Sequence, residues 1–152
     1  MEYRLGAIGA MTDEYEKALN ELKVVLKSIT VDTFLKEVAS NEEDFKSIRN
    51  ITLHIIRSGY SYSNYVRKWF NEETTSVKIE VNTTEECISE IEKMFLYHIA
   101  TYEGKWLMSD DEMMKVIIKT SWTTYDLEAI IEHAIVHILR HRLQIQKLLK
   151  SI

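Results

Sequence analysis

The chain has 152 residues, of which 45% are hydrophobic and 28% are charged, and these values are typical of a single globular domain over residues 1–152. Its formal net charge of −5 gives no electrostatic basis for binding nucleic acid, which requires a clustered basic surface. No apolar run approaches the ~20 residues of a membrane span, and the N-terminus lacks a signal-peptide pattern. The single cysteine, Cys87, cannot form an internal disulfide, so we expect a soluble cytoplasmic protein that binds neither nucleic acid nor membrane.

The absence of proline and the presence of only four glycines favour long helices with few turns. Apolar residues at three- and four-residue spacing predict a first long helix over residues 12–28, followed by a further helical turn or two near residues 33–38. A second long helix is predicted over residues 40–69, opened by a Ser-x-x-Glu capping box at residues 40–43. Gly59 inside this helix indicates either space for a bound group or a kink or close contact with another helix, and we favour the kink or contact.

The second half of the chain is predicted to contain two more long helices and a shorter one. Residues 77–81 alternate like a strand, but five residues alone cannot form a sheet, so an extended connector is expected. A capping box predicts a third long helix over residues 83–104, which Gly104 can end. A shorter helix is predicted over residues 109–118, and the last long helix begins at residues 123–124 and reaches the C-terminus. These elements predict an all-α protein, a four-helix bundle with one or two short extra helices.

Three of the five histidines lie at four-residue intervals on the last helix, which places successive rings one turn apart. The buried stripe of this helix is marked by Leu127, Ile130, Ile131, Ala134, Ile138, Ile145 and Leu148. Steps of three and four residues place His137, His141 and Gln144 inside this stripe and His133 at its edge. Buried imidazoles need partners for their ring nitrogens, and a divalent metal ion supplies them. His54 lies on or beside the buried face of the second helix, so it is a third candidate ligand.

Three further side chains have interpretations that the sequence leaves open. Tyr62 shares the buried stripe of the second helix, so it either lines a pocket at the metal site or only fills the core. His98, on the apolar face of the third helix, is a group beside the metal site, an alternative ligand, or a core histidine that is hydrogen-bonded elsewhere. Arg142 either binds an anionic group of a substrate or pairs with a neighbouring carboxylate.

Two segments of the sequence resemble the DinB/YfiT-like family. Residues 131–145 contain His-x-x-x-His followed by Arg-x-Gln, which is similar to the last-helix motif of that family. Residues 51–56 resemble the segment that carries the family's single histidine on its second helix. The order and spacing of the predicted helices agree as well, so the resemblance spans most of the chain. The glycine that usually separates the arginine and glutamine of the motif is Leu143 here.

The resemblance implies a four-helix bundle with an up-up-down-down course, frequently found as a homodimer. It also implies that His54, His137 and His141 hold one divalent metal ion, whereas His133 matches a histidine that is not usually a ligand. Three histidines leave a coordination position open for water or substrate, as in catalytic metal sites. Zinc and nickel are the ions we expect first, although imidazole suits most first-row divalent metals.

The resemblance and the open metal site lead to two hypotheses of function. The first is a metal-dependent enzyme, because the DinB-like superfamily includes S-transferases that use low-molecular-weight thiols in detoxification and bacterial stress response; a hydrolase is the other enzymatic alternative. The second is a non-catalytic stress protein that binds a metal or small ligand, because no carboxylate is spaced as a catalytic base. In a third interpretation, the histidines are only hydrogen-bonded residues of a structural bundle. The sequence indicates no catalytic residue beyond the metal ligands.

Overall fold

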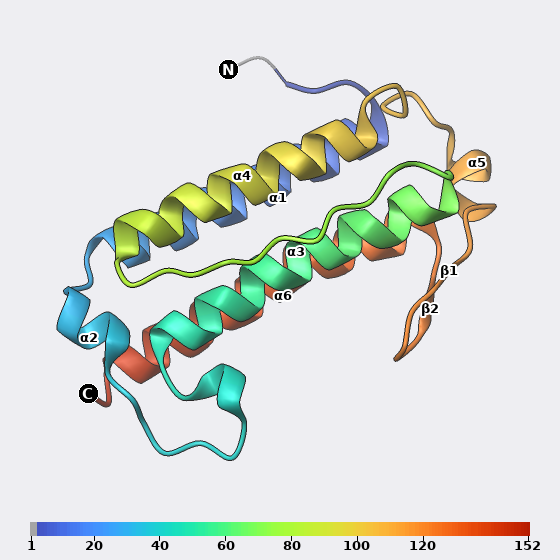
Figure 1. The fold of residues 1–152 in the computed structure, drawn as a ribbon. Coiled ribbons are helices and arrows are strands. Elements are labelled where there is room, and N and C mark those ends of the chain that lie inside the picture. The colour runs from blue at the N-terminus through green and yellow to red at the C-terminus, as the bar shows by residue number, and fades with distance from the viewer. Residues whose placement is uncertain (1–2) are drawn as a thin grey trace.

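Four long helices make up most of the protein and lie side by side (Figure 1). The computed structural model describes residues 3–152 and is 66% helical, which confirms the expected all-α class. The long helices are α1 (Gly6–Lys27), α3 (Ile48–Trp69), α4 (Thr84–Tyr102) and α6 (Leu127–Leu149). None of the helices within residues 3–152 is long and apolar enough to cross a membrane.

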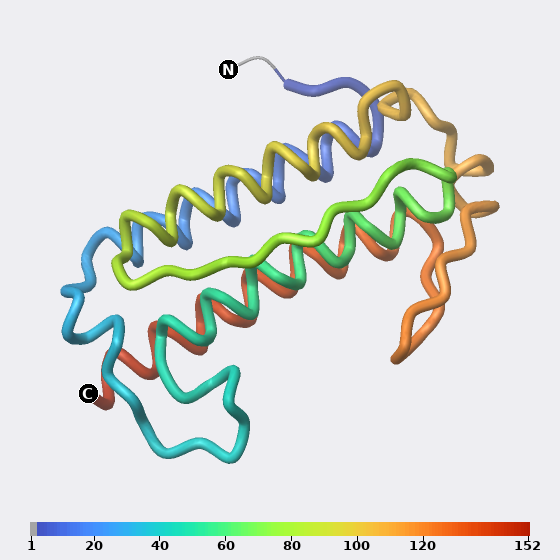
Figure 2. The backbone as a smooth tube through the Cα atoms, in the orientation of Figure 1, coloured from blue at the N-terminus to red at the C-terminus, as the bar shows by residue number. Residues whose placement is uncertain are grey.

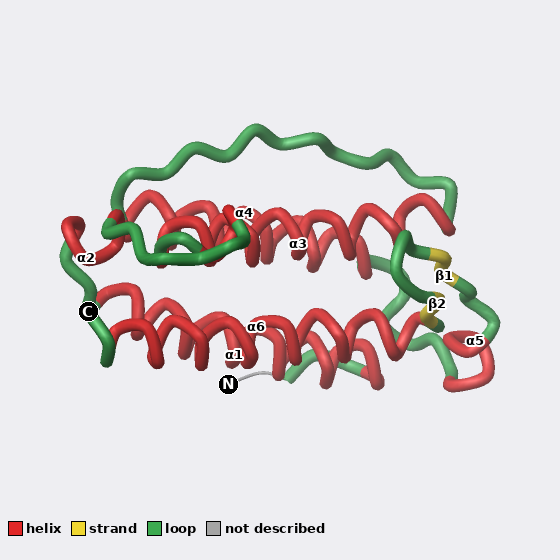
Figure 3. The backbone as a smooth tube through the Cα atoms, turned by 90° about the horizontal axis from the view of Figure 1, so that it is seen from below, coloured by secondary structure: helices red, strands yellow, loops and turns green. Residues whose placement is uncertain are grey.

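The helices form two parallel pairs, α1 with α6 and α3 with α4, and the two pairs run in opposite directions (Figure 1, Figure 3). Each long helix packs against two neighbours: α1 against α4 and α6, and α3 against the same two helices. The contacts of Tyr60 with Tyr97 and of Arg67 with Thr101 show that α3 and α4 are parallel, because residue numbers rise together along both helices. The contacts of Tyr62 with His133 and of His54 with His137 show that α3 and α6 are antiparallel, because residue numbers rise along one helix and fall along the other. The order along the chain is up-down-down-up, so the expected up-up-down-down course is wrong.

The paths of two connections explain this order. Residues 28–47 link α1 to α3 and stay at one end of the helices, so the chain reverses direction; they include α2 (Val31–Leu35) and the 3-10 helix η1 (Glu43–Phe45). Residues 72–81 have no regular structure and run back along α3, as Figure 2 shows, so α4 starts at the same end as α3. An up-up-down-down bundle needs two long crossovers of this kind, whereas the described part of the chain makes one.

Hydrogen bonds attach the connection between α3 and α4 to the helices. The Nε atom of Arg49 donates to the carbonyl oxygen of Val81 at 2.6 Å. The side-chain amide of Asn64 donates to the backbone carbonyl of Thr75 and accepts from its N–H, at 2.8 and 3.1 Å. Val81 itself is fully buried. The prediction of an extended connector over residues 77–81 is therefore confirmed.

Three of the long helices begin at other residues than predicted. The last of them, α6, begins at Leu127, later than residues 123–124. α1 begins at Gly6, earlier than residue 12. α3 is capped by Ser47, whose hydroxyl accepts from the backbone N–H of Asn50 at 3.0 Å. The serine of the predicted capping box, Ser40, instead accepts from a backbone N–H within the loop before η1. Both serines are acceptable helix caps, so local preference alone did not choose between them.

A short hairpin replaces the second part of the helix predicted over residues 109–118. The elements in this region are α5 (Asp110–Met114), β1 (Ile118–Lys119) and β2 (Thr124–Tyr125). The predicted cap at Ser109 is present, and it forms a full capping box with Glu112. β1 and β2 then pair in antiparallel fashion. α6 follows the hairpin, where the carboxylate of Asp126 accepts from the backbone N–H of Ala129 at 2.8 Å.

Gly59 marks a close contact between α3 and α4. A Cβ atom at this position would collide with the side chain of Met94, which is fully buried. The hydroxyl of Tyr15 donates to the sulfur of Met94 at 3.4 Å and so helps to fix this side chain. The interpretation of Gly59 as a helix contact is confirmed, and no bound group is needed to explain it.

Gly6 and Gly104 have the same backbone geometry but different surroundings, with φ angles of 73° and 76°. A Cβ atom at Gly6 would collide with the carbonyl oxygen of Trp106, whereas a Cβ at Gly104 would meet open space. We predict that Gly104→Ala lowers the free energy of unfolding by about 1 kcal/mol, which is the strain of the left-handed region alone. Gly6→Ala should lower it by about 2–4 kcal/mol, because the collision adds to that strain. Urea denaturation of both variants measures the difference, and equal losses would contradict the contact at Trp106.

Candidate metal centre

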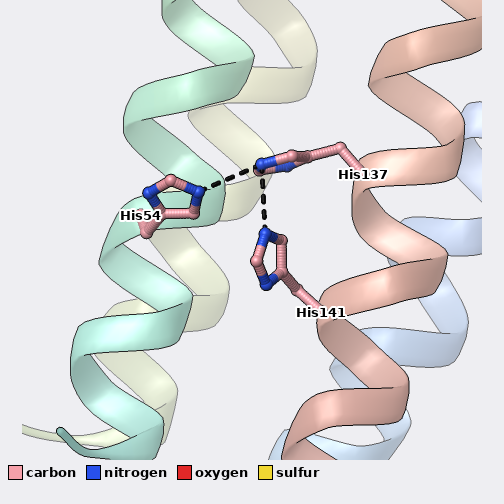
Figure 4. Close-up of side chains that lie close together, drawn as sticks. All are labelled: His54, His137 and His141. Carbon is pink, nitrogen blue, oxygen red and sulfur yellow. Dashed lines mark hydrogen bonds between the residues drawn. The ribbon is translucent and has the colours of Figure 1, made fainter. Parts of the chain in front are cut away.

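Three imidazole side chains converge between α3 and α6 (Figure 4). His54 comes from α3, and His137 and His141 come from α6, one turn apart. The Nε2 atom of His137 lies 3.1 Å from that of His54 and 3.2 Å from that of His141. One nitrogen of each ring lies within 4.8 Å of the other two. Nitrogens bound tetrahedrally to zinc at about 2.0–2.1 Å are about 3.3 Å apart, so the two distances from His137 suit a shared divalent ion.

The buried stripe of α6 carries two of these histidines into the protein interior. His137 and His141 are 7% and 6% exposed, and Ala134 and Ile138 beside them in the stripe are buried as well. The side chain of His54 is less buried, at 27% exposed. The predicted positions of His137 and His141 in the stripe are therefore confirmed. His54 completes the cluster from the facing helix.

Two of the histidines are held by hydrogen bonds at Nδ1, the ring nitrogen that is not part of the cluster. The Nδ1 atom of His54 lies 3.1 Å from a carboxylate oxygen of Asp44, and that of His141 lies 2.8 Å from Oε1 of Gln144. Both oxygens are acceptors, so Nδ1 donates in each ring. The lone pair of each Nε2 is then free and faces the cluster. A ring with its hydrogen on Nδ1 is the tautomer that can bind a metal ion through Nε2.

His137 has no such partner at Nδ1. This atom is buried and makes no hydrogen bond within residues 3–152. Burial, together with the neighbouring His141 and His54, lowers the pKa of His137 to about 3, so the ring is neutral near pH 7. Burial also lowers the pKa of His141, although its hydrogen bond to Gln144 opposes the shift.

A neutral His137 cannot satisfy the two rings that face it. With its hydrogen on Nε2 it donates to one of the two lone pairs of His54 and His141, and with its hydrogen on Nδ1 three lone pairs face one another. Unpaired polar atoms of this kind are rare in buried surroundings because each one is unfavourable by about 1–3 kcal/mol. A cation between the three Nε2 atoms removes the problem, so the donor set fits a divalent metal ion.

The cluster has three protein ligands and an open side. Across residues 3–152, no aspartate, glutamate or cysteine joins the three histidines. A pocket of about 590 Å³ lies next to the rings. The pocket is lined by Phe45, His54, His137, Arg140, His141, Leu143, Gln144 and Lys147. Three ligands beside a pocket are typical of metal sites that bind a substrate, because structural sites use four protein ligands.

Tyr62 and His133 lie beside the cluster and do not line the pocket. Tyr62 packs edge-to-face against His137, with ring centroids 5.7 Å apart. Burial raises the pKa of Tyr62 to about 12, so its phenol remains protonated near neutral pH. His133 is half-buried and packs against Tyr62 and Tyr125, with ring centroids 5.3 Å apart in both pairs. Both residues therefore support the His137 side of the cluster by packing.

His98 lies away from the cluster, between α1 and α4. Its Nε2 atom is 3.3 Å from the hydroxyl of Thr12, and its ring packs against Tyr15 and Tyr102. The residue is 4% exposed, and burial lowers its pKa to about 3. Of the alternatives for His98, the hydrogen-bonded core histidine describes its position, and the structure does not bring it to the metal cluster.

The pocket and its rim contain four side chains that the sequence did not indicate: Asp44, Phe45, Arg140 and Lys147. Asp44 and Phe45 lie in η1, which the sequence assigns to the first turn of a helix. The ring of Phe45 packs against both His54 and His141, with centroids 5.6 and 5.7 Å apart. Arg140 and Lys147 are exposed charges on α6, and in sequence they do not differ from an ordinary solvated helix face.

Comparison with known proteins adds no family to these observations. No protein-family model matches the chain, and no curated protein matches it in sequence. The DinB/YfiT-like resemblance therefore rests on the motif residues and the spacing of the predicted helices, and stays a prediction. The candidate metal centre does not depend on it, because the convergence of the three rings is a property of the structure.

We predict that Asp44→Ala weakens metal binding by about tenfold, because a carboxylate that orients a ligand histidine typically contributes 10- to 100-fold and Asp44 is half exposed. Glu43→Ala is the matched control, since Glu43 is the preceding acid of η1 and its carboxylate pairs with Lys46 instead. Competition with a chromophoric chelator gives both affinities. An equal change in the two variants would show that only the general negative charge of η1 matters.

The buried neutral His98 makes the metal-free protein sensitive to acid. Its pKa is about 3 when folded and 6.5 for an ordinary histidine, so the unfolded chain takes up a proton between these values and the folded chain does not. The stability that the neutral His98 contributes to the folded protein above pH 6.5 is therefore lost as the pH falls towards 3. We predict that His98→Gln reduces the slope of unfolding free energy against pH by up to about 1.4 kcal/mol per pH unit. Urea denaturation between pH 7 and pH 4 measures both slopes; parallel lines would contradict the assignment.

Proposed function

We propose that this chain is a DinB/YfiT-like four-helix-bundle protein that binds one divalent metal ion through His54, His137 and His141 and uses it in an enzymatic reaction. The reaction proposed first is conjugation of a low-molecular-weight thiol to an electrophile, in which the thiol loses its proton and its sulfur bonds to the electrophilic carbon in place of a leaving group. The observation that carries the proposal is the convergence of three Nε2 atoms beside an open pocket, with no fourth ligand from residues 3–152. Zinc and nickel are the ions proposed first, since both accept imidazole ligands.

The residues around the cluster have separate roles in this proposal. His54, His137 and His141 hold the ion, and Asp44 and Gln144 keep a hydrogen on the outer nitrogen of two of these rings. Phe45 packs over the rings of His54 and His141 and keeps water from that side. A divalent ion held by these histidines would lower the pKa of a thiol or water bound to it, and would thereby supply a nucleophile near neutral pH.

The lining of the pocket favours thiol chemistry over hydrolysis. None of the lining side chains is a carboxylate, a thiol or a phenol, and the three imidazoles are committed to the metal. A hydrolase commonly uses such a group as a general base for water. A thiol needs less help because its own pKa of about 8.5 is already close to neutral.

The same lining also supports a second candidate function, a non-catalytic protein that binds a metal or a small ligand. Such a protein needs the three histidines and the pocket and no acid or base beside them. Association of two copies is part of the proposal in both cases. Val136, Leu139 and Leu143 are exposed apolar residues on one stretch of α6 and offer a surface for a homodimer.

Metal content tests the site first. We predict about one divalent ion per chain in protein purified without an affinity tag, and almost none in His137→Ala, because removal of one of three ligands opens the set. His133→Ala is the matched control, since it removes a histidine one turn earlier that is outside the cluster. Elemental analysis of the three proteins decides the matter. Equal metal in wild type and His137→Ala would rule out the site.

Activity tests the reaction next. The metal-loaded protein is assayed for conjugation of bacillithiol, mycothiol or glutathione to an electrophile, and activity should be lost in His137→Ala and kept in His133→Ala. A protein that holds metal and conjugates none of the three thiols is not a transferase of this kind. That result leaves the non-catalytic binding protein as the better description.

A further inference from the structure

Two cations on α6 face the pocket of the candidate metal centre. Arg140 follows His137 by three residues, and Lys147 follows Gln144 by three residues, so all of these side chains share one side of the helix. Gln144 uses its carbonyl oxygen to accept from His141, which leaves its amide NH₂ as a further donor. The lining of the pocket therefore combines these donors with the three candidate metal ligands.

Arg140 and Lys147 line the pocket without an ion-pair partner, whereas Arg142, two residues from Arg140, pairs with Glu21 of α1. In the part of the chain that the structure describes, no carboxylate lies within ion-pair distance of Arg140 or Lys147. Their charges are therefore available to a ligand.

Acidic side chains do not cancel this charge at the pocket. No acid lines the pocket, and Asp44 at its edge is engaged by His54 and lies 4.0 Å from Arg57. The protein as a whole is anionic, at −5, so the pocket is a local exception.

We infer that this pocket binds a small ligand with an anionic group, which Arg140 and Lys147 hold while the other end of the ligand reaches the metal. The inference rests on the proposed metal site and narrows its substrate class to anionic ligands, of which a thiol that carries a carboxylate is the one we test. The pocket volume of about 590 Å³ is within the range of pockets that bind small molecules. Phe45 and Leu143 in the lining provide apolar contacts for its carbon chain.

Two thiols of similar size test the inference on protein loaded with Co²⁺, whose absorption reports a bound thiolate. They are 3-mercaptopropionate, which carries a carboxylate, and 2-mercaptoethanol, which carries none. We predict that the wild-type protein binds the anionic thiol about tenfold more tightly than Arg140→Met/Lys147→Met does, since two partly exposed ion pairs are removed. Binding of 2-mercaptoethanol should be the same in both proteins. The comparison between proteins cancels the different intrinsic affinities of the two thiols for cobalt.

Lys150→Met is the matched control, because it removes an exposed lysine at the end of the same helix that does not line this pocket. It should leave the affinity for 3-mercaptopropionate unchanged. The advantage of the anionic thiol in wild type should also shrink as salt is raised, because exposed charges are screened.

The outcomes separate this inference from the proposed function. If the protein takes up no cobalt, the metal site fails and the inference fails with it. If cobalt binds and the double variant loses no affinity for 3-mercaptopropionate, the metal site stands and the anion-binding role of Arg140 and Lys147 is overturned. A similar loss for both thiols also overturns it, because the two residues would then act on the metal site in general.

Discussion

Three imidazole nitrogens that face one another inside a helix interface leave lone pairs that hydrogen bonds among the neutral rings cannot all satisfy. His54 and His141 direct free lone pairs at His137, because their outer nitrogens donate to Asp44 and Gln144. A proton is a poor solution, since burial lowers the pKa of His137 to about 3. A divalent ion could satisfy these lone pairs, and the spacing of His137 from each of the other two rings is compatible with one.

The course of the chain determines where this cluster forms. Because the connection over residues 72–81 returns to the start of α3, α4 is parallel to α3 and the last helix must run back towards η1. The second half of α6 then lies beside the first half of α3, which brings His137 and His141 opposite His54. η1 packs against the same part of α3, so Asp44 and Phe45 reach the rings of the cluster. One long crossover thus positions both the ligands and their hydrogen-bond partners.

Sequence periodicity predicted the parts of this arrangement that depend on burial within one helix. His137 and His141 follow the apolar stripe of α6, and that stripe needs no knowledge of the neighbouring helices. The direction of each helix was not predictable in this way, because both possible courses bury the same stripes. η1 and Asp44 were missed for a local reason, since Ser40 and Ser47 are competing caps and only tertiary contacts choose the second one.

The two cations that line the pocket, Arg140 and Lys147, show a different limit of sequence reasoning. Exposed arginines and lysines are common on helices, and a one-dimensional pattern gives no reason to separate Arg140 from Arg142. The structure separates them, because Arg142 reaches Glu21 on the neighbouring helix while Arg140 lines the pocket. Near the candidate metal ligands an unpaired cation raises the local electrostatic potential. The potential at the pocket therefore depends on which basic residues of α6 pair with α1 and which remain unpaired.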